Sequence, residues 1–220
     1  MGVSQRYHLE ASACGPLERY EACKFMARGY AAEARTDSVR LARARAFCSL
    51  VLHSLWQVHA GLLKSRMGPP RSPVSHGAHR ITKEAKELAA SAGEIIAQFP
   101  VADAGYLVGS IYTVMLPPSY RSQVGAYYTP PPLVSRLLEQ AESAGFDFST
   151  GNVIDPACGG GAFLAPTAMR MADSMRQKGG SDEWIFAAIS QRLRGMEIDP
   201  FAAWMSHTLL ELSLLPLCKS

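Results

Sequence analysis

Two acidic residues and the glycine-rich turn between them are the part of this sequence best suited to holding a ligand. The segment NVIDPACGGGAFL (152–164) is a short apolar run that ends in Asp155, followed by a glycine turn and the start of an apolar helix. A strand, a tight loop and a helix N-terminus in this order hold nucleotide-like ligands in α/β proteins. Gly159 and Gly161 can let a ligand approach the main chain closely. The alternative is that these glycines serve only the tight packing of a strand against a helix.

The acids indicate which kind of ligand the turn would hold. Pyrophosphate-binding loops have the spacing G-x-G-x-x-G, whereas this loop has a single G-x-G preceded by Asp155, which would repel a phosphate and suit an ammonium group. Glu197 ends a second apolar run, and a carboxylate there can hold both hydroxyls of a ribose. Ile198 can pack against an adenine ring or belong to the core. Asp199, directly before a proline, is better suited to be a helix N-cap or a surface ion pair.

The elements that would position these groups follow from apolar periodicity and from the residues that end helices. Helices are expected over 37–67, 82–99, 102–115, 131–144, 162–178 and 201–212, and strands over 152–155 and 193–198. A polar, aromatic connector is expected over 119–130, and Ser181 is a candidate N-cap for one further helix. The two strands and the helices between them predict a right-handed crossover in a parallel sheet, with Glu197 on the strand next to Asp155.

The chain is expected to divide into a helical region (1–67), a linker rich in Pro, Gly and Ser (68–80), a helical segment (81–118) and a ligand-binding domain (119–220). In the first region Arg40, Arg43 and Arg45 share the face opposite the apolar one. They are expected to form a solvated basic face or, alternatively, a face that contacts nucleic-acid phosphates. His76 and His79 in the linker have no other metal-ligating residues nearby, so a surface loop is expected there.

Composition sets the broad class of protein. Hydrophobic residues make up 48% and charged residues 19%, which indicates a globular chain, and the net charge of +3 is compatible with binding nucleic acid. Five cysteines without a C-x-x-C pair indicate neither a disulfide framework nor a zinc site, so a reduced, cytoplasmic setting is expected. No secretory signal and no contact with a membrane are expected, because no apolar run approaches the ~18 residues of a membrane helix.

Three consecutive segments resemble adenine-specific DNA methyltransferases of the restriction-modification type. GAYYTPPPLVSRLL (125–138) is similar to the family's F/Y-x-T-P-x-x-V, and DPACGGGAFL (155–164) is similar to D-P-A-C-G-S-G-x-F-L, with Gly160 where serine is usual. RGMEIDPFAAWMSHTLLEL (194–212) is similar to G-x-E-I-D-P followed by an alanine-rich helix. The resemblance covers about residues 100–215. It implies an α/β chain in which a helical N-terminal region precedes an incomplete Rossmann-like methyltransferase fold of about two parallel strands with flanking helices.

The resemblance implies S-adenosylmethionine as cofactor and adenine in DNA as methyl acceptor. Carried over by position, Tyr128, Thr129 and Pro130 would lie over the methionine end of the cofactor, and Asp155 would contact its amino group. The backbone of Ala157, Gly159 and Gly161 would follow the methionine and the ribose. Glu197 would hold the ribose hydroxyls, and Ile198 would lie against the adenine. For Tyr127 and Tyr128, packing under the glycine loop is the alternative.

The sequence also departs from the family in that it contains no Asn-Pro-Pro or Asp-Pro-Pro, the motif that presents the flipped base to the cofactor. The chain is therefore expected to be the N-terminal, cofactor-binding portion of such an enzyme, by truncation or gene splitting, and to be inactive alone. The alternative is a non-catalytic subunit that binds cofactor or DNA and pairs with a second polypeptide carrying the catalytic motif. A protein or RNA methyltransferase is disfavoured by the T-P-P-x-x-V segment.

Because two parallel strands make a poor sheet, and the last helix (201–212) should pack on further strands, marginal or partner-dependent stability is expected.

Overall fold

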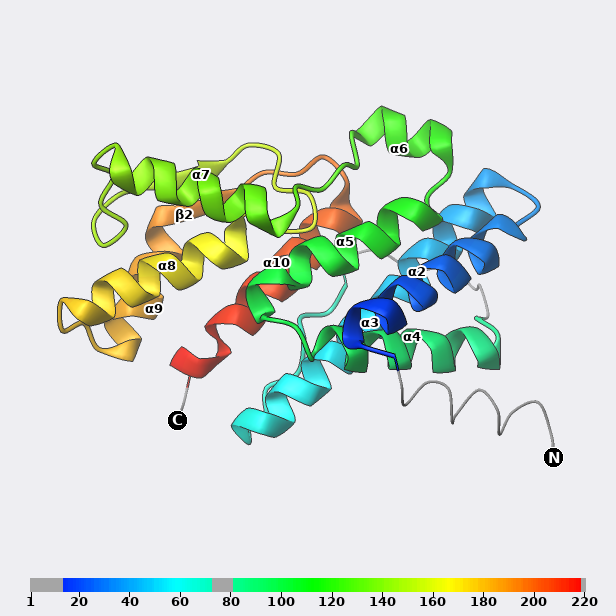
Figure 1. The fold of residues 1–220 in the computed structure, drawn as a ribbon, viewed down its shortest axis with the longest axis horizontal. Coiled ribbons are helices and arrows are strands. Elements are labelled where there is room, and N and C mark those ends of the chain that lie inside the picture. The colour runs from blue at the N-terminus through cyan, green and yellow to red at the C-terminus, as the bar shows by residue number, and fades with distance from the viewer. Residues whose placement is uncertain (1–13, 73–80, 219–220) are drawn as a thin grey trace.

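The computed structural model describes residues 14–72 and 81–218, and in these ranges the chain is mostly helical with one two-stranded parallel sheet (Figure 1). The elements are α2 (Pro16–Ala32), α3 (Asp37–Leu63), α4 (Lys83–Ile96), η1 (Val101–Asp103), α5 (Ala104–Met115), α6 (Pro118–Val124), α7 (Pro131–Ser143), β1 (Val153–Asp155), α8 (Leu164–Gln177), α9 (Asp182–Arg192), β2 (Leu193–Gly195), α10 (Pro200–Leu214) and η2 (Leu215–Leu217). His76, His79 and most of the predicted linker lie outside the described residues, as does the stretch before residue 14. No helix in the described ranges has both the length and the apolar character needed to cross a membrane.

The helices predicted from periodicity are confirmed, with ends that differ by a few residues. Short polar side chains at their N-termini accept hydrogen bonds from backbone N–H groups that have no partner within the helix. The Thr36, Thr82 and Ser181 side chains do so for α3, α4 and α9, which confirms Ser181 as an N-cap, and Asp199 does so for α10.

Two predictions of local structure are wrong. The expected connector over 119–130 contains α6, whose first residue is a proline, a residue that suits the first helical turn. The second strand ends at Gly195 and not at residue 198. Beyond it the Met196 N–H still donates to the Asp155 carbonyl, and the Cys158 N–H donates to the Met196 carbonyl. The chain then leaves the ladder and carries Glu197 to the end of the sheet.

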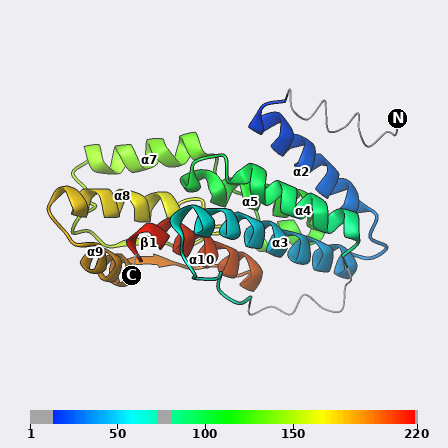
Figure 2. The ribbon, with the colours of Figure 1, turned by 90° about the horizontal axis from the view of Figure 1, so that it is seen from below.

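The helices pack around two apolar cores. The first joins α2, α3, α4 and α5 to one face of α10 along most of its length, and the second joins α8, α9 and β2 to Leu214 at the end of α10 and to Leu217 of η2. Figure 1 shows α10 between α5 and α8, and Figure 2 shows α3, α4 and α5 running alongside one another. The predicted division into four regions stays a prediction, although the first core draws on residues from three of them.

The apolar surface of α10 is covered by this chain itself. Trp204, Met205, Leu209, Leu212 and Leu214 are all at most 8% exposed. The expectation that this helix needs further strands to cover it is therefore wrong, because α3, α5 and α8 surround it.

The sheet is covered on one face only. Val153 pairs with Leu193 and Ile154 with Arg194, so the members of each pair point to the same side. Leu193 faces the core with α8 and α9, whereas Ile154, Met196 and Ile198 are 60%, 58% and 77% exposed. The incomplete α/β arrangement that the sequence predicts is thus present as one parallel pair with an open face.

Candidate functional site

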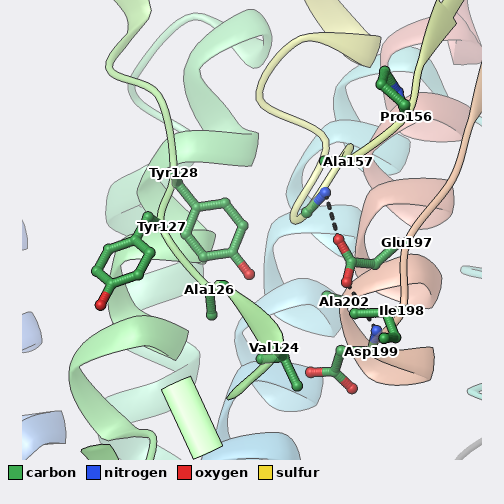
Figure 3. A pocket seen from close by; sticks show the side chains of 12 residues that line it. Val124, Ala126, Tyr127, Tyr128, Pro156, Ala157, Glu197, Ile198, Asp199 and Ala202 are labelled. Atoms are coloured by element: carbon green, nitrogen blue, oxygen red, sulfur yellow. Dashed lines mark hydrogen bonds between the residues drawn. The ribbon is translucent and has the colours of Figure 1, made fainter. Parts of the chain in front are cut away.

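A cavity of about 140 Å³ lies where the two strands end (Figure 3). Three segments enclose it: the stretch after α6, the loop after β1 and the turn between β2 and α10. Its lining residues are Val124, Gly125, Ala126, Tyr127, Tyr128, Pro156, Ala157, Gly159, Glu197, Ile198, Asp199 and Ala202. The volume is below the ~300–1,000 Å³ of typical ligand pockets, so the cavity can enclose part of a nucleoside-sized ligand while the rest lies outside it.

Glu197 connects the two loops that flank the cavity. Its Oε2 accepts a hydrogen bond from the Gly159 N–H at 2.8 Å, and its Oε1 accepts from the Asp199 N–H at 2.8 Å. A carboxylate oxygen has two lone pairs, so each oxygen can accept one more hydrogen bond. The geometry therefore leaves capacity for two donors, such as the adjacent hydroxyls of a ribose.

Asp155 ends β1 as predicted, but it is not among the residues that line the cavity. Its Oδ1 accepts a hydrogen bond from the Ala157 N–H at 3.1 Å, which fixes the first turn of the loop. Thr129 and Pro130 also lie outside the lining, and Pro130 caps the N-terminus of α7. The structure thus brings Tyr128, Ala157, Gly159, Glu197 and Ile198 together at the cavity.

The Tyr128 ring is the side chain that packs under the glycine loop. Added methyl groups at Gly109, Gly159 and Gly160 would lie 2.8–2.9 Å from ring atoms of Tyr128, so the ring fills the space between α5 and the loop. Its hydroxyl is buried and has no hydrogen-bond partner among the described residues. Burial, reinforced by the charges of Glu197 and Asp199, raises the pKa of this phenol well above its usual value, so the hydroxyl keeps its proton and can donate it. Tyr127, by contrast, is 68% exposed.

The glycines of the loop serve close packing. Gly159 and Gly161 have φ values of +51° and +85°, which favour glycine. The backbone of Gly161 lies against α5, where a methyl on Gly105 would be 2.9 Å from it. At Gly160, where the resembled family has serine, a methyl would lie 2.9 Å from Tyr128 and 3.0 Å from Met205. The packing interpretation therefore holds for much of the loop, and the loop residues that line the cavity are Pro156, Ala157 and Gly159.

Gly105 and Gly109 are site-forming residues that the periodicity argument missed. The helix over 102–115 was expected to be buried all round, without a particular face for the loop. Their four-residue spacing was the signal, because residues four apart share a helix face and two glycines there let another backbone approach.

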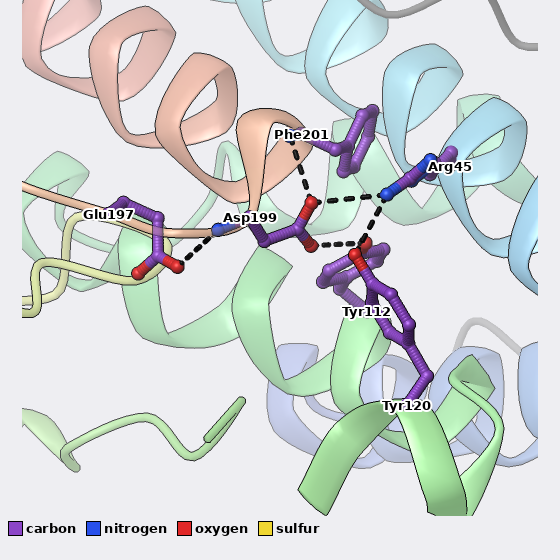
Figure 4. A network of polar contacts seen from close by, with 6 residues as sticks. All are labelled: Arg45, Tyr112, Tyr120, Glu197, Asp199 and Phe201. Carbon is purple, nitrogen blue, oxygen red and sulfur yellow. Dashed lines mark hydrogen bonds and ion pairs between the residues drawn. The ribbon is translucent and has the colours of Figure 1, made fainter. Parts of the chain in front are cut away.

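Asp199 is buried and forms hydrogen bonds with side chains of α3 and α5 (Figure 4). Its Oδ1 accepts from the Phe201 N–H at 3.0 Å, which confirms the N-cap, and from Arg45 Nη2 at 3.2 Å. Its Oδ2 accepts from the Tyr112 hydroxyl at 2.7 Å, and Arg45 also donates to the Tyr120 hydroxyl at 2.9 Å. The side chain is 1% exposed, so the expected surface ion pair is instead a buried one.

The arginines of α3 make contacts within the chain. Arg40 donates to the Met115 carbonyl at 2.8 Å, and Arg43 donates to the Tyr30 carbonyl at 2.7 Å. With Arg45 on Asp199, all three guanidinium groups are half-buried and bonded inside the fold. The expectation of a freely solvated basic face is therefore wrong, and the alternative, contact with nucleic-acid phosphates, stays a prediction.

A cavity at the carboxyl ends of paired parallel strands, closed by a glycine loop, is an arrangement in which α/β proteins hold ligands. Residues 104–209 match the family model described as N-6 DNA methylase. This segment contains the residues that line the cavity, and the match confirms the resemblance drawn from the three motifs. Searches of curated proteins and of solved structures returned no match.

Proposed function

We propose that this chain binds S-adenosylmethionine at the cavity around Glu197, as the cofactor-binding part of a DNA adenine methyltransferase. The observation that carries the proposal is the position of Glu197, which joins the two loops at the strand ends and retains one acceptor site on each oxygen. The match of residues 104–209 to the N-6 DNA methylase family model supports the choice of cofactor.

The residues at the cavity suit different parts of such a ligand. Glu197 would accept from the two ribose hydroxyls, and the exposed Ile198 would lie against the adenine. The backbone of Ala157 and Gly159 would follow the ribose and the methionine chain. The unpaired Tyr128 hydroxyl would donate to a polar atom of the ligand, since a buried donor without a partner is unfavourable. Asp155, at the strand end outside the cavity, would accept from the amino group directly or through water.

When bound, S-adenosylmethionine supplies the methyl group. Methylating the exocyclic amine of adenine also requires side chains that hold and orient that amine, and an aromatic face for the extruded base. The sequence contains no Asn-Pro-Pro or Asp-Pro-Pro, and the cavity offers no equivalent set among the described residues. We therefore expect the chain by itself to bind the cofactor without methylating DNA.

Calorimetric titration with S-adenosylmethionine tests the binding site. Replacing Glu197 by alanine removes both acceptors, and at about 1 kcal/mol for each hydrogen bond the affinity should fall about tenfold or more. Glu142→Ala is the matched control, because Glu142 is an exposed acid on α7 outside the cavity. No binding by the wild-type chain, or an equal loss in the two variants, would refute the proposal.

The open face of the sheet favours a second candidate, a subunit that binds cofactor or DNA and pairs with a second polypeptide carrying the catalytic motif. Ile154 on β1 and Met196 and Ile198 in the segment after β2 are exposed apolar side chains, and apolar sheet faces are usually covered. Co-expression with the product of the adjoining reading frame tests this idea: a stable complex that methylates adenine in DNA, and that Ile154→Asp disrupts, would support it. DNA methylation by the purified chain alone would contradict both this candidate and the expected inactivity.

A further inference from the structure

We propose that Arg45, Tyr112 and Tyr120 are positioning residues for Glu197: they hold Asp199, and Asp199 in turn holds Glu197 at the cavity. The inference rests on the proposed function for its consequence in cofactor binding. The positioning itself is a property of the chain without any ligand, so it can be tested separately.

A continuous series of hydrogen bonds connects α3 to the glycine loop. Arg45 and Tyr112 fix the two carboxylate oxygens of Asp199, at 3.2 Å and 2.7 Å. The backbone N–H of the same Asp199 then donates to Glu197 at 2.8 Å. Glu197 accepts from Gly159 with its other oxygen, also at 2.8 Å. Asp199, Glu197 and Gly159 line the cavity, and Tyr112 contacts Asp199.

Burial makes the side-chain end of this series restrictive. The Asp199 side chain is 1% exposed and the Tyr112 side chain is fully buried, so neither can exchange its partner for water without moving the backbone. Asp199 is thereby held at both oxygens and at its own N-cap bond to α10. The main-chain N–H of Asp199 is fixed together with its side chain. This N–H donates to Glu197, so the donor that orients Glu197 has one position.

The two ends of the series lie far apart in the sequence. Arg45 belongs to α3, outside residues 104–209 that match the family model, whereas Asp199 and Glu197 lie inside them. The N-terminal helices would accordingly determine how the cofactor acid is presented. The competing explanation is that the cluster only stabilises the packing of α3 on α10.

A pair of tyrosine variants separates the two explanations. Tyr112→Phe removes the hydroxyl that donates to Asp199. Tyr20→Phe is the matched control, because the Tyr20 hydroxyl is equally buried and donates at 2.8 Å to the Leu107 carbonyl, in the same core but away from the cavity. Both variants lose one buried hydrogen bond, and Tyr112→Phe should lose somewhat more stability because its acceptor is a carboxylate. Only Tyr112→Phe should disturb Glu197.

The first measurement is hydrogen exchange of the Gly159 and Asp199 amides in the chain without cofactor. Under conditions where exchange occurs by local opening, Tyr112→Phe should accelerate both amides about tenfold relative to the Tyr20→Phe variant, since both donate to Glu197. Unchanged exchange, or equal acceleration in the control, would overturn the inference. If Tyr112→Phe does not fold, Tyr120→Phe, which removes a partner of Arg45 at the margin of the cluster, replaces it with the same expectation in direction.

The second measurement is the affinity for S-adenosylmethionine in the same variants. Tyr112→Phe should raise the Kd about tenfold, and Tyr20→Phe should leave it unchanged within about twofold, a tenfold change being about 1.4 kcal/mol. If the wild-type chain does not bind the cofactor, the proposed function fails, while the exchange rates still decide whether the cluster positions Glu197. Equal loss of affinity in the two tyrosine variants would assign the cluster to packing alone and overturn the inference.

Discussion

Replacing Glu197 by glutamine should destabilise the chain even without a ligand. The two carboxylate oxygens each accept a backbone N–H at 2.8 Å, from Gly159 and from Asp199. Glutamine has one acceptor oxygen and one NH2 group. Whichever way the amide is turned, its NH2 group faces a backbone N–H, so one hydrogen bond is lost and the other no longer involves a charge.

The magnitude follows from these two bonds. A hydrogen bond to a charged group contributes about 1.5–3 kcal/mol, against about 1 kcal/mol for a neutral pair. Losing one such bond and weakening the other should lower the free energy of unfolding by about 1.5–3 kcal/mol, because Glu197 is half-buried and water can replace part of the loss. For a chain of 220 residues this corresponds to a fall in Tm of about 3–12 °C.

Urea denaturation and thermal melting of the purified chain measure the effect. Glu142→Gln is the control, because Glu142 pairs with Arg170 at 2.8 Å on the surface with its side chain 58% exposed. Exposed pairs contribute at most about 1 kcal/mol. A Glu197→Gln variant within about 0.5 kcal/mol of the wild type, or a control that falls as far, would refute the assignment of Glu197 as the link between the two loops.

Three further predictions concern glycines at close contacts and a half-buried histidine. Gly93→Ala should lower the free energy of unfolding, measured in urea, by about 1–3 kcal/mol, because its methyl would lie 2.6 Å from atoms of α3. Gly29→Ala, whose methyl would have nothing within 4 Å, should raise it by up to about 1 kcal/mol. Changes of the same sign in the two variants would contradict the close packing at Gly93. Gly109→Ala should force the Tyr128 ring out of place, since the methyl would lie 2.9 Å from it, and should lower stability by about 1–3 kcal/mol; an unchanged near-UV dichroism spectrum and melting curve would show that the ring yields freely. Burial lowers the pKa of His59, so on acidification the unfolded chain takes up a proton before the folded chain does. The free energy of unfolding should therefore fall as the pH drops below about 6.5, by at most about 1.4 kcal/mol per pH unit. His59→Gln should remove this pH dependence, and parallel pH profiles for the two proteins would contradict the role of His59.

Local signals made much of the fold predictable. Apolar spacing located the helices, and the apolar run ending in an acid before a glycine turn located the strand at Asp155. Ser181 was identifiable as a cap because a short hydroxyl side chain before two acids suits a helix N-terminus. These features depend on residues within a few positions of one another, which a sequence displays directly.

The interactions that close the site depend on residues far apart in the chain. Periodicity placed Arg45 on the face opposite the apolar stripe, but it could not indicate that Asp199, 154 positions away, would receive it. The same holds for the Tyr128 ring, whose contact with Gly109 requires α5 and the glycine loop to be docked first. That α3 covers α10 likewise depends on tertiary packing. Reasoning from the resembled fold alone predicted strands as the packing partners of α10.

The ion pair between Arg45 and Asp199 also determines how the chain can be divided into expression units. Residues 104–209, which carry the family match, include the carboxylate and exclude its cation. Cutting the chain at residue 104 would take the Arg45 cation away from the buried Asp199 carboxylate, and removing one partner of a buried pair costs about 3–5 kcal/mol. That is a large part of the ~5–15 kcal/mol that stabilises a typical domain. The segment recognisable by sequence is therefore smaller than the segment that can stand alone, and any minimal protein designed around the cavity has to retain α3.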